Sequence, residues 1–216
     1  MPKILHYYRE TEPPHSLLLS LKEQLESLAL FSEVEKIQNI LTETCFNVQI
    51  EGSEILNDDQ SSKLEWLLAE TFEKIKLRLE ESAFSAASNK SLSLEFGPRM
   101  TFTSAFSSNA VSICHACSLT SITRLEKSRR YHLNLTSPLS EEATTVIKSV
   151  LHDRMTEQSY PSPISTFKSD VLTQQVTTIP IMKDGRKALE KVNAKMGLGF
   201  DDFDLDYYTD LFKVIM

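Results

Sequence analysis

Residues 43–51, ETCFNVQIE, decide how this chain begins to fold. The apolar side chains of Phe46, Val48 and Ile50 occupy every second position, and mostly polar or charged residues stand between them. Successive side chains of a β-strand point to opposite faces, so this alternation predicts a half-buried strand.

The segments around this strand predict a β-α-β-β-α unit. Strands are expected at residues 4–8 and 34–40, and leucines recurring at helical spacing predict an amphipathic helix over residues 16–30. Asn57 is a plausible N-cap for a further helix with a leucine-rich face. Residues 75–80 alternate apolar and charged side chains, and both helix and strand remain open there.

The same order of elements recurs in the second half of the chain. Residues 92–96 predict a strand, 108–119 a helix, and 122–127 with 131–135 a pair of strands, before Ser140 caps a strong amphipathic helix. The halves share this order but little residue identity. The sequence therefore predicts an α+β fold, in which two tandem β-α-β-β-α units form a pseudo-dimeric antiparallel-sheet domain.

Composition changes after Tyr160. Residues 161–178 are rich in Pro, Ser, Thr and Gln, which is typical of a linker. Two short helices are expected beyond it, the first ending at Gly197 as its C-cap. We therefore expect an N-terminal domain over residues 1–160 and a small helical linker domain over residues 161–216.

The last expected helix has an apolar face made of Leu205, Tyr208, Leu211 and Phe212. The sequence stops at Met216, soon after this face. An apolar element with nothing following it suggests a missing neighbour, so we expect a chain truncated before a further domain.

Composition limits the classes of function and partner. The formal net charge is -7, which argues against a general nucleic-acid binder because such proteins need cationic surface. No apolar run approaches the roughly 20 residues that span a bilayer, and the first residues contain no signal-peptide pattern. Three cysteines fit reduced thiols, so we expect a cytoplasmic protein without nucleic-acid or membrane partners.

The scarcity of glycine argues against a nucleotide site. The chain has only 5 glycines, whereas phosphate-binding loops need several close together so that backbone N–H groups can reach the anion. No phosphate-loop, dinucleotide-binding or hydrolase motif is present. We therefore expect no catalytic, cofactor-binding or metal-binding residues.

Two patterns that resemble metal sites have simpler explanations. Cys114 and Cys117 form a CxxC pair on an expected helix, but a structural zinc site needs four ligands and no second pair completes it, so core packing is favoured. Asp202, Asp204 and Asp206 resemble the start of a calcium loop, but the required glycine and glutamate are missing.

Arg124, Lys127, Arg129 and Arg130 form the only cluster of basic residues. Spread over two strands, they could make a stripe that docks an anion. A solvated sheet edge is the favoured interpretation, because lysine and arginine protect such edges from aggregation.

A second cluster stands at the end of the last helix of the N-terminal domain. His152, Asp153, Arg154 and Glu157 place acid, base and cation within one turn. Catalysis would need a partnered nucleophile or a metal, so spacing alone favours polar packing at a helix end.

Several stretches together resemble the N-terminal region of the large, single-chain phosphoribosylformylglycinamidine synthases. They are ILHYYR (residues 4–9), ETCFNV (43–48), EFGPR (95–99), SSNAVSI (107–113), LHDRMTE (151–157), GRKALEKVN (185–193) and DLDYY (204–208). Each is modest alone, but their succession over nearly the whole chain is specific.

This resemblance implies an enzyme of four parts: an N-terminal domain, a linker domain, a synthetase domain that uses ATP and magnesium, and a glutaminase domain. The enzyme converts formylglycinamide ribonucleotide, glutamine and ATP to formylglycinamidine ribonucleotide, glutamate, ADP and phosphate. The resemblance also implies that the N-terminal domain is similar to a pair of the small separate subunits that some bacteria use.

In this family a histidine-rich segment then opens the synthetase domain, whereas here residues 213–216 read KVIM. No catalytic, ATP-binding or magnesium-binding position can therefore be carried onto this chain. We expect a structural and docking front end, non-catalytic alone, whose partners are the synthetase and glutaminase domains. A stand-alone non-catalytic binding module remains the alternative. The candidate interface residues are His152, Asp153, Arg154, Glu157, Tyr208 and Phe212.

Overall fold

The computed structural model describes residues 3–52, 56–69, 76–84, 88–160, 163–169 and 175–215. Contacts divide the chain into two compact units, residues 1–170 and 171–216, which are described separately. This division falls inside the predicted linker. The domain boundary after Tyr160 stays a prediction, because compactness alone does not define an independently folding domain.

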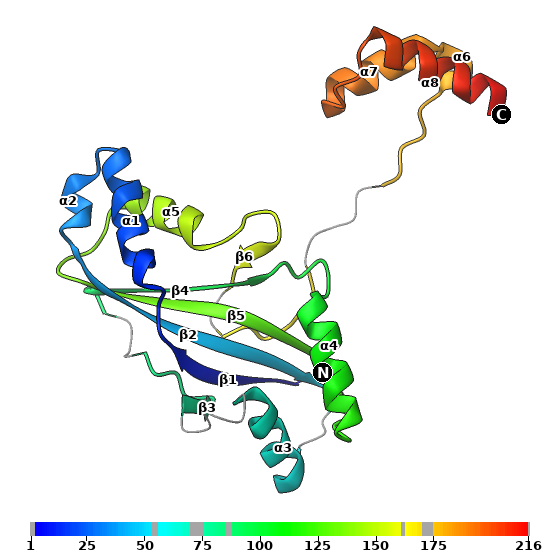
Figure 1. Cartoon of the computed structure of the whole chain (residues 1–216). Helices are drawn as coiled ribbons and strands as arrows, with labels where there is room; N and C mark the ends of the chain where they lie inside the picture. Colours follow the sequence, from blue (N-terminus) through cyan, green and yellow to red (C-terminus); the bar gives the residue numbers. More distant parts are fainter. Residues whose placement is uncertain are drawn as a thin grey trace. The chain divides into compact units, whose positions relative to one another are not determined.

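The first unit is built on one antiparallel sheet (Figure 1). Its order is β3-β1-β2-β5-β4-β6, so the long strands β2 and β5 pair at the centre and the halves mirror each other outward. The bounds are β1 (Lys3–Thr11), β2 (Ile37–Ile50), β3 (Leu77–Leu79), β4 (Ser91–Pro98), β5 (Ile122–Leu135) and β6 (Glu157–Ser159). The predicted α+β class and paired halves are confirmed.

The order of elements within each half needs one correction. The two strands predicted at 34–40 and 44–50 form the single strand β2, and those at 122–127 and 131–135 form β5. The second half therefore reads β-α-β-α-β, and the first half has the same order with one additional short helix before its long strand. The residues left between the predicted strands are paired in the ladder, where Glu43 stands opposite Arg130. Residues 77–79 are a strand, which resolves the open assignment for the described part of 75–80.

Helices follow the expected caps in both halves. They are α1 (His15–Ser27), α2 (Phe31–Val34), α3 (Asp58–Leu68), α4 (Ala105–Ala116) and α5 (Glu141–Leu151). The Asn57 side chain accepts the Gln60 backbone N–H at 2.9 Å, and the Ser140 side chain accepts that of Ala143 at 3.1 Å. Both predicted N-caps are therefore confirmed, because each satisfies a donor that the first helical turn leaves unpaired.

Two buried clusters hold the helices on one face of the sheet. The first joins α1 and α5 to β4, β5 and the start of β2. The second joins α3 and α4 to β1, the end of β2 and the start of β5. Ile40 and Phe46, an even number of positions apart in β2, contribute to the first and the second cluster respectively, so the clusters share a face.

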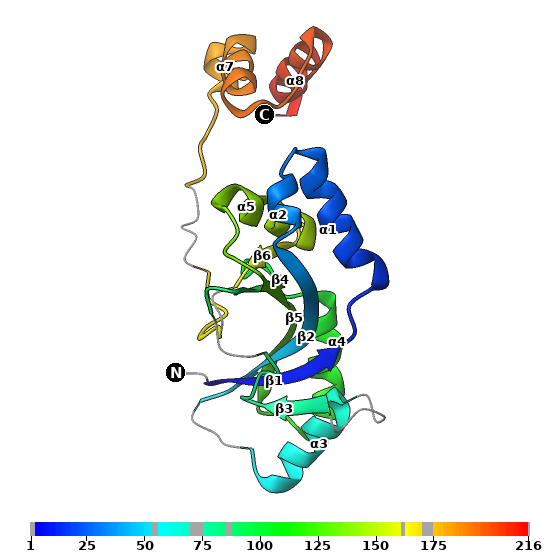
Figure 2. The same ribbon diagram turned by 90° about the vertical axis from the view of Figure 1, so that its left-hand side faces the viewer.

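Each cluster takes one helix from each half of the chain, so the halves interlock. In Figures 1 and 2 the two helix pairs stand near opposite ends of the long central strands. Neither half completes a core alone, because Leu25 of the first half packs in the same cluster as Ile147 of the second. The two halves of the chain therefore share both clusters, and neither half has a core of its own.

The second unit contains α6 (Ile181–Asp184), α7 (Arg186–Met196) and α8 (Asp202–Ile215). Gly197 adopts φ 65° and ψ 41° after α7, which confirms the predicted C-cap. Ile181, Leu189 and Leu205 form a small core. The prediction that the last helix exposes Leu205 is wrong, because α6 and α7 fold back to cover it. None of the described helices has the length and apolar character needed to cross a membrane.

Candidate functional site

The turn after α5 begins with polar packing at a helix end. Nδ1 of His152 lies 2.5 Å from the Lys148 carbonyl, and its ring stacks on Phe96 with 4.4 Å between the ring centroids. The carbonyl of Arg154 accepts a hydrogen bond from Nη2 of Arg99 at 2.5 Å. These contacts anchor the turn to β4 and to the segment that follows it.

The acidic residues fix the rest of the turn. Asp153 accepts hydrogen bonds from the Met155 backbone N–H and the Thr156 hydroxyl, both at 2.8 Å, and these bonds hold its pKa below the usual value. Both carboxylate oxygens of Glu157 accept from Nη2 of Arg129, at 2.8 and 2.6 Å. Glu157 therefore links the turn to the basic cluster on β5, two features that the sequence left separate.

The basic cluster lies on a central strand and is divided between two faces. β5 pairs with β2 along its length and with β4 only at residues 129–134, so the favoured interpretation of a solvated sheet edge is wrong for Arg129 and Arg130. Arg124 and Lys127 lie beyond the β4 ladder. Lys127 and Arg129 point to the helix-bearing face, and Arg124 and Arg130 to the other. Local spacing cannot reveal which strands become neighbours, which is why the sequence suggested an edge.

Lys127 and Arg129 line a depression in the helix-bearing face, which we call the central cleft. It consists of two hollows of about 240 and 230 Å³ that share both side chains. The first hollow reaches Leu17 in α1, and the second reaches Phe106 in α4. Two cations thus stand in the gap between the helix pairs, on a face that is otherwise largely apolar.

The face of the sheet without helices carries a buried group that we call the Arg130 network. Arg130 pairs with Glu43 through Nη1 at 2.5 Å and with Glu95 through Nε at 3.1 Å. Its guanidinium carbon lies 4.8 Å from the ring centroid of Tyr8 and 5.2 Å from that of Phe84. Carboxylates and rings together compensate the desolvated cation.

Further hydrogen bonds complete the network. Glu43 accepts from the Ser82 hydroxyl and the Ala83 backbone N–H, both at 2.8 Å. Glu95 accepts from the Ser128 hydroxyl at 2.6 Å. A buried charge is costly unless it is paired and hydrogen-bonded, and here both carboxylates are. The network therefore fixes residues 82–83 against the sheet.

Sequence reasoning missed Glu43 and Glu95 as members of a site. The available signal was a charged residue inside an alternating strand, at the position facing away from its apolar neighbours. Their neighbour Cys45 is buried, and burial raises the pKa of its thiol, as does the charge of Glu95. A protonated thiol is a poor nucleophile, so Cys45 fits a packing role.

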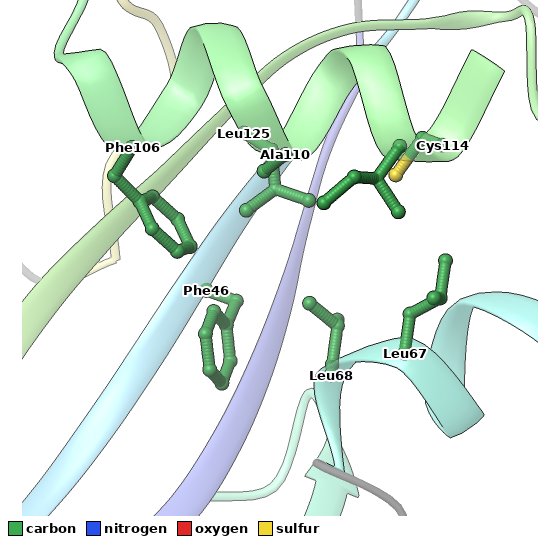
Figure 3. A pocket seen from close by; sticks show the side chains of 8 residues that line it. Phe46, Leu67, Leu68, Phe106, Ala110, Cys114 and Leu125 are labelled. Atoms are coloured by element: carbon green, nitrogen blue, oxygen red, sulfur yellow. The ribbon is translucent and has the colours of Figure 1, made fainter. Parts of the chain in front are cut away.

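An apolar cavity of about 210 Å³, the α3–α4 groove, opens between α3 and α4 (Figure 3). Its lining residues are all apolar or weakly polar: Phe46, Leu67, Leu68, Phe106, Ala110, Ile113, Cys114 and Leu125. Ile113 stays 53% exposed and Phe106 42%. Burial raises the pKa of the Cys114 thiol to about 11, which agrees with its predicted packing role. Exposed apolar surface of this kind is typical of protein–protein contact sites.

The second unit places its two candidate interface residues differently from each other. Tyr208 is half-buried, and its ring lies 5.1 Å from that of Phe200. Phe212 is 38% exposed, and Phe203 on the same helix is 77% exposed. An interface role for Tyr208 and Phe212 stays a prediction.

The acidic residues of α8 have protein partners. Arg186 of α7 pairs with Asp206 at 2.7 Å and also with Asp202. Across the ranges that the structure describes, no group of three or more His, Cys, Asp or Glu is placed to hold a metal ion. The described residues thus do not fit a magnesium centre, and no chemical step through magnesium or ATP is derived from them.

Comparison with known proteins shows which family this chain resembles in sequence. The family model described as formylglycinamide ribonucleotide amidotransferase N-terminal matches residues 43–166. The chain is 45% identical over 180 residues to phosphoribosylformylglycinamidine synthase of Dictyostelium discoideum, covering 82% of the chain and 13% of that relative.

Two further relatives agree. One is the probable chloroplastic/mitochondrial phosphoribosylformylglycinamidine synthase of Arabidopsis thaliana, 39% identical over 214 residues, which cover 98% of the chain and 15% of the relative. The other is the human synthase, 36% identical over 188 residues, which cover 85% and 14% respectively. The chain thus spans only a small part of the length of the relatives that it matches.

An antiparallel-sheet domain of interlocked halves, followed by a small helical unit, is the class of protein that the structure defines. The chain belongs to the formylglycinamide ribonucleotide amidotransferase N-terminal family, whose model covers more than half of it.

Proposed function

We propose that this chain is the N-terminal part of a phosphoribosylformylglycinamidine synthase and serves there as a non-catalytic docking domain. The enzyme uses glutamine and ATP to convert formylglycinamide ribonucleotide to formylglycinamidine ribonucleotide in purine biosynthesis. The partners of the chain are the synthetase and glutaminase domains of the same enzyme. ATP and magnesium act in the synthetase domain, outside this chain.

The α3–α4 groove is the observation that carries the proposal. Exposed Phe106 and Ile113 flank an apolar cavity, a surface that a partner protein typically covers. The matched region makes up 13% of the Dictyostelium relative, so most of that protein's length is available as the partner. We therefore assign the groove to a side chain from the synthetase or glutaminase domain.

Two further surfaces support docking. The turn at residues 152–157 offers acidic and basic groups as a polar rim, and Phe203 and Phe212 leave apolar surface on α8. A cytoplasmic location completes the proposal for this chain. The Arabidopsis relative has chloroplastic/mitochondrial in its name, so cell fractionation is the direct check.

The test expresses this chain separately from the rest of a relative such as the Dictyostelium enzyme and measures their association by titration. Replacing Phe106 and Ile113 together with alanine should weaken association by about 2 kcal/mol or more if they are anchors. Leu19→Ala is the matched control, because Leu19 is 62% exposed on α1, away from the groove. Equal affinity of the double variant and wild type would remove the groove from the interface.

Tyr208→Ala combined with Phe212→Ala tests the second unit in the same assay. A loss of about 2 kcal/mol is expected if α8 also anchors the partner, and no loss would exclude both residues. Failure of the wild-type chain to bind would contradict docking altogether. The chain alone should neither hydrolyse glutamine nor form the amidine, and product above a heat-killed control would contradict a non-catalytic role.

A further inference from the structure

The central cleft contains three polar side chains whose hydrogen-bonding groups are not all used within the fold. Thr44 of β2 stands directly opposite Arg129 of β5, and Lys127 lies two residues before Arg129 on the same face. All three side chains line the hollow of about 240 Å³. Residues two apart on one strand face are separated by about 7 Å, so one small ligand can reach both cations.

These groups have unused hydrogen-bonding capacity. Thr44 is 4% exposed, and its hydroxyl has no hydrogen-bond partner among the residues that the structure describes. Lys127 is exposed and likewise has no ion pair within the described ranges. Arg129 uses only Nη2 to bind Glu157, so Nε and Nη1 remain available for another acceptor.

The charges around the cleft favour an anion. Lys127 and Arg129 contribute two positive charges, of which Glu157 offsets one. Glu43 and Arg130 also border the hollow, but their side chains point to the opposite face of the sheet and pair with each other there. Glu12 is exposed at the rim. A neutral or cationic ligand would leave Lys127 and the free Arg129 donors without an acceptor.

We propose that Lys127, Arg129 and Thr44 bind the phosphate group of a small phosphate monoester. A tetrahedral phosphate presents three terminal oxygens, enough for an ammonium, a guanidinium and a hydroxyl at once, whereas a carboxylate has only two oxygens. The second hollow of about 230 Å³, which shares Lys127 and Arg129, gives room for the organic part of the ester. The second hollow shares Phe106 and Glu157 with the docking surfaces proposed above, but phosphate binding requires no partner domain, so its test does not depend on docking.

The experiment titrates the 216-residue chain with inorganic phosphate and then with glycerol 2-phosphate, at constant ionic strength maintained with chloride. Backbone amide NMR shifts of Thr44, Lys127 and Arg129 should change saturably with both ligands. Lys127→Gln should weaken phosphate binding at least fivefold, and Thr44→Val at least twofold. Lys90→Gln is the charge-matched control, since Lys90 is exposed elsewhere on the sheet domain, and it should bind like wild type.

Three results would overturn the proposal. One is the absence of a saturable response to phosphate beyond that of chloride. Another is equal phosphate affinity of the Lys127→Gln and Lys90→Gln variants, whose intact fold is verified by their unperturbed amide spectra. The third is that acetate binds as tightly as phosphate with the same dependence on Lys127, which would define a general anion surface.

Discussion

The two helix pairs on the sheet have the same architecture but differ in closure. α1 lies against α5, and Leu21, Leu25 and Ile147 fill the space between them and the sheet. α3 and α4 stand apart, and the smaller side chains of Ala110 and Cys114 help to leave the cavity of about 210 Å³ (Figure 3). The well-packed α1–α5 pair can therefore be compared directly with the α3–α4 pair, which contains the groove.

The closed α1–α5 pair contributes to stability, whereas the open α3–α4 pair leaves apolar surface for a proposed partner. A filled core gains dispersion contacts and excludes water, whereas a groove leaves its lining partly without contacts. An apolar groove that persists beside a well-packed equivalent costs stability in the isolated domain. The α3–α4 groove is therefore the region where we expect a partner to bind.

The largest effect should come from charging the closed pair. Ile147 is 0% exposed, so Ile147→Asp buries an unpaired carboxylate and should destabilise the domain by about 4 kcal/mol or more. Ile113→Asp, at a position 53% exposed in the open pair, should cost less than about 1 kcal/mol. Urea unfolding of both variants measures the contrast, and similar losses would mean that the two pairs are equally closed.

Removing the cation of the Arg130 network comes next. Arg130→Ala leaves the buried carboxylates of Glu43 and Glu95 without their ion-pair partner, which should cost about 3–5 kcal/mol. Because this network spans the strands under both helix pairs, the variant should still unfold in a single transition by calorimetry. Two separated transitions would show that the two clusters are independent.

A smaller effect should follow pH through His132, which lies on the face opposite the helices. Burial lowers the pKa of its imidazole below the usual value of about 6.5. The unfolded chain then takes up a proton at higher pH than the folded chain, so the stability contribution is present above pH about 6.5 and is lost as pH falls below it. The melting temperature of the wild-type chain should therefore decrease as the pH is lowered below about 6.5.

The control for this titration is His132→Gln, which removes the ionisable ring while keeping a polar side chain near Ser93. Its melting temperature should depend less on pH in the same window. An identical slope in the variant would assign the pH dependence to other groups.

The smallest effect should come from filling the groove. Ala110→Leu adds apolar volume to the cavity between α3 and α4 and should change the free energy of unfolding by no more than about 1 kcal/mol, in the stabilising direction if the side chain fits. The same substitution should weaken association with the remaining domains. Stronger or unchanged association would mean that the groove receives no partner side chain.

Several local features could be derived from the sequence because their causes are local. The caps at Asn57, Ser140 and Gly197 depend on residues a few positions away. The alternation through residues 44–50 marks one buried face of β2 whatever strand lies beside it. These signals were enough for the α+β class and for the repeated halves.

The partners of β2 and β5 were beyond such reasoning. Each long strand was predicted as two separate strands, since nothing local shows that Glu43 will meet Arg130, 87 positions later. The same ignorance of neighbours placed the basic cluster at an edge. Leu205 was expected to be exposed because helical spacing shows an apolar face but not the elements that cover it.

By itself, the sequence determined most of the helices and strands, the caps at Asn57, Ser140 and Gly197 and the two-part repetition, because periodicity and capping act within a few residues. Only the tertiary structure decided that the halves interlock, that the cations of β5 divide between a buried network and an open cleft, and that α3 and α4 stay apart. These outcomes depend on contacts between residues far apart in the chain, where burial and charge pairing act through space.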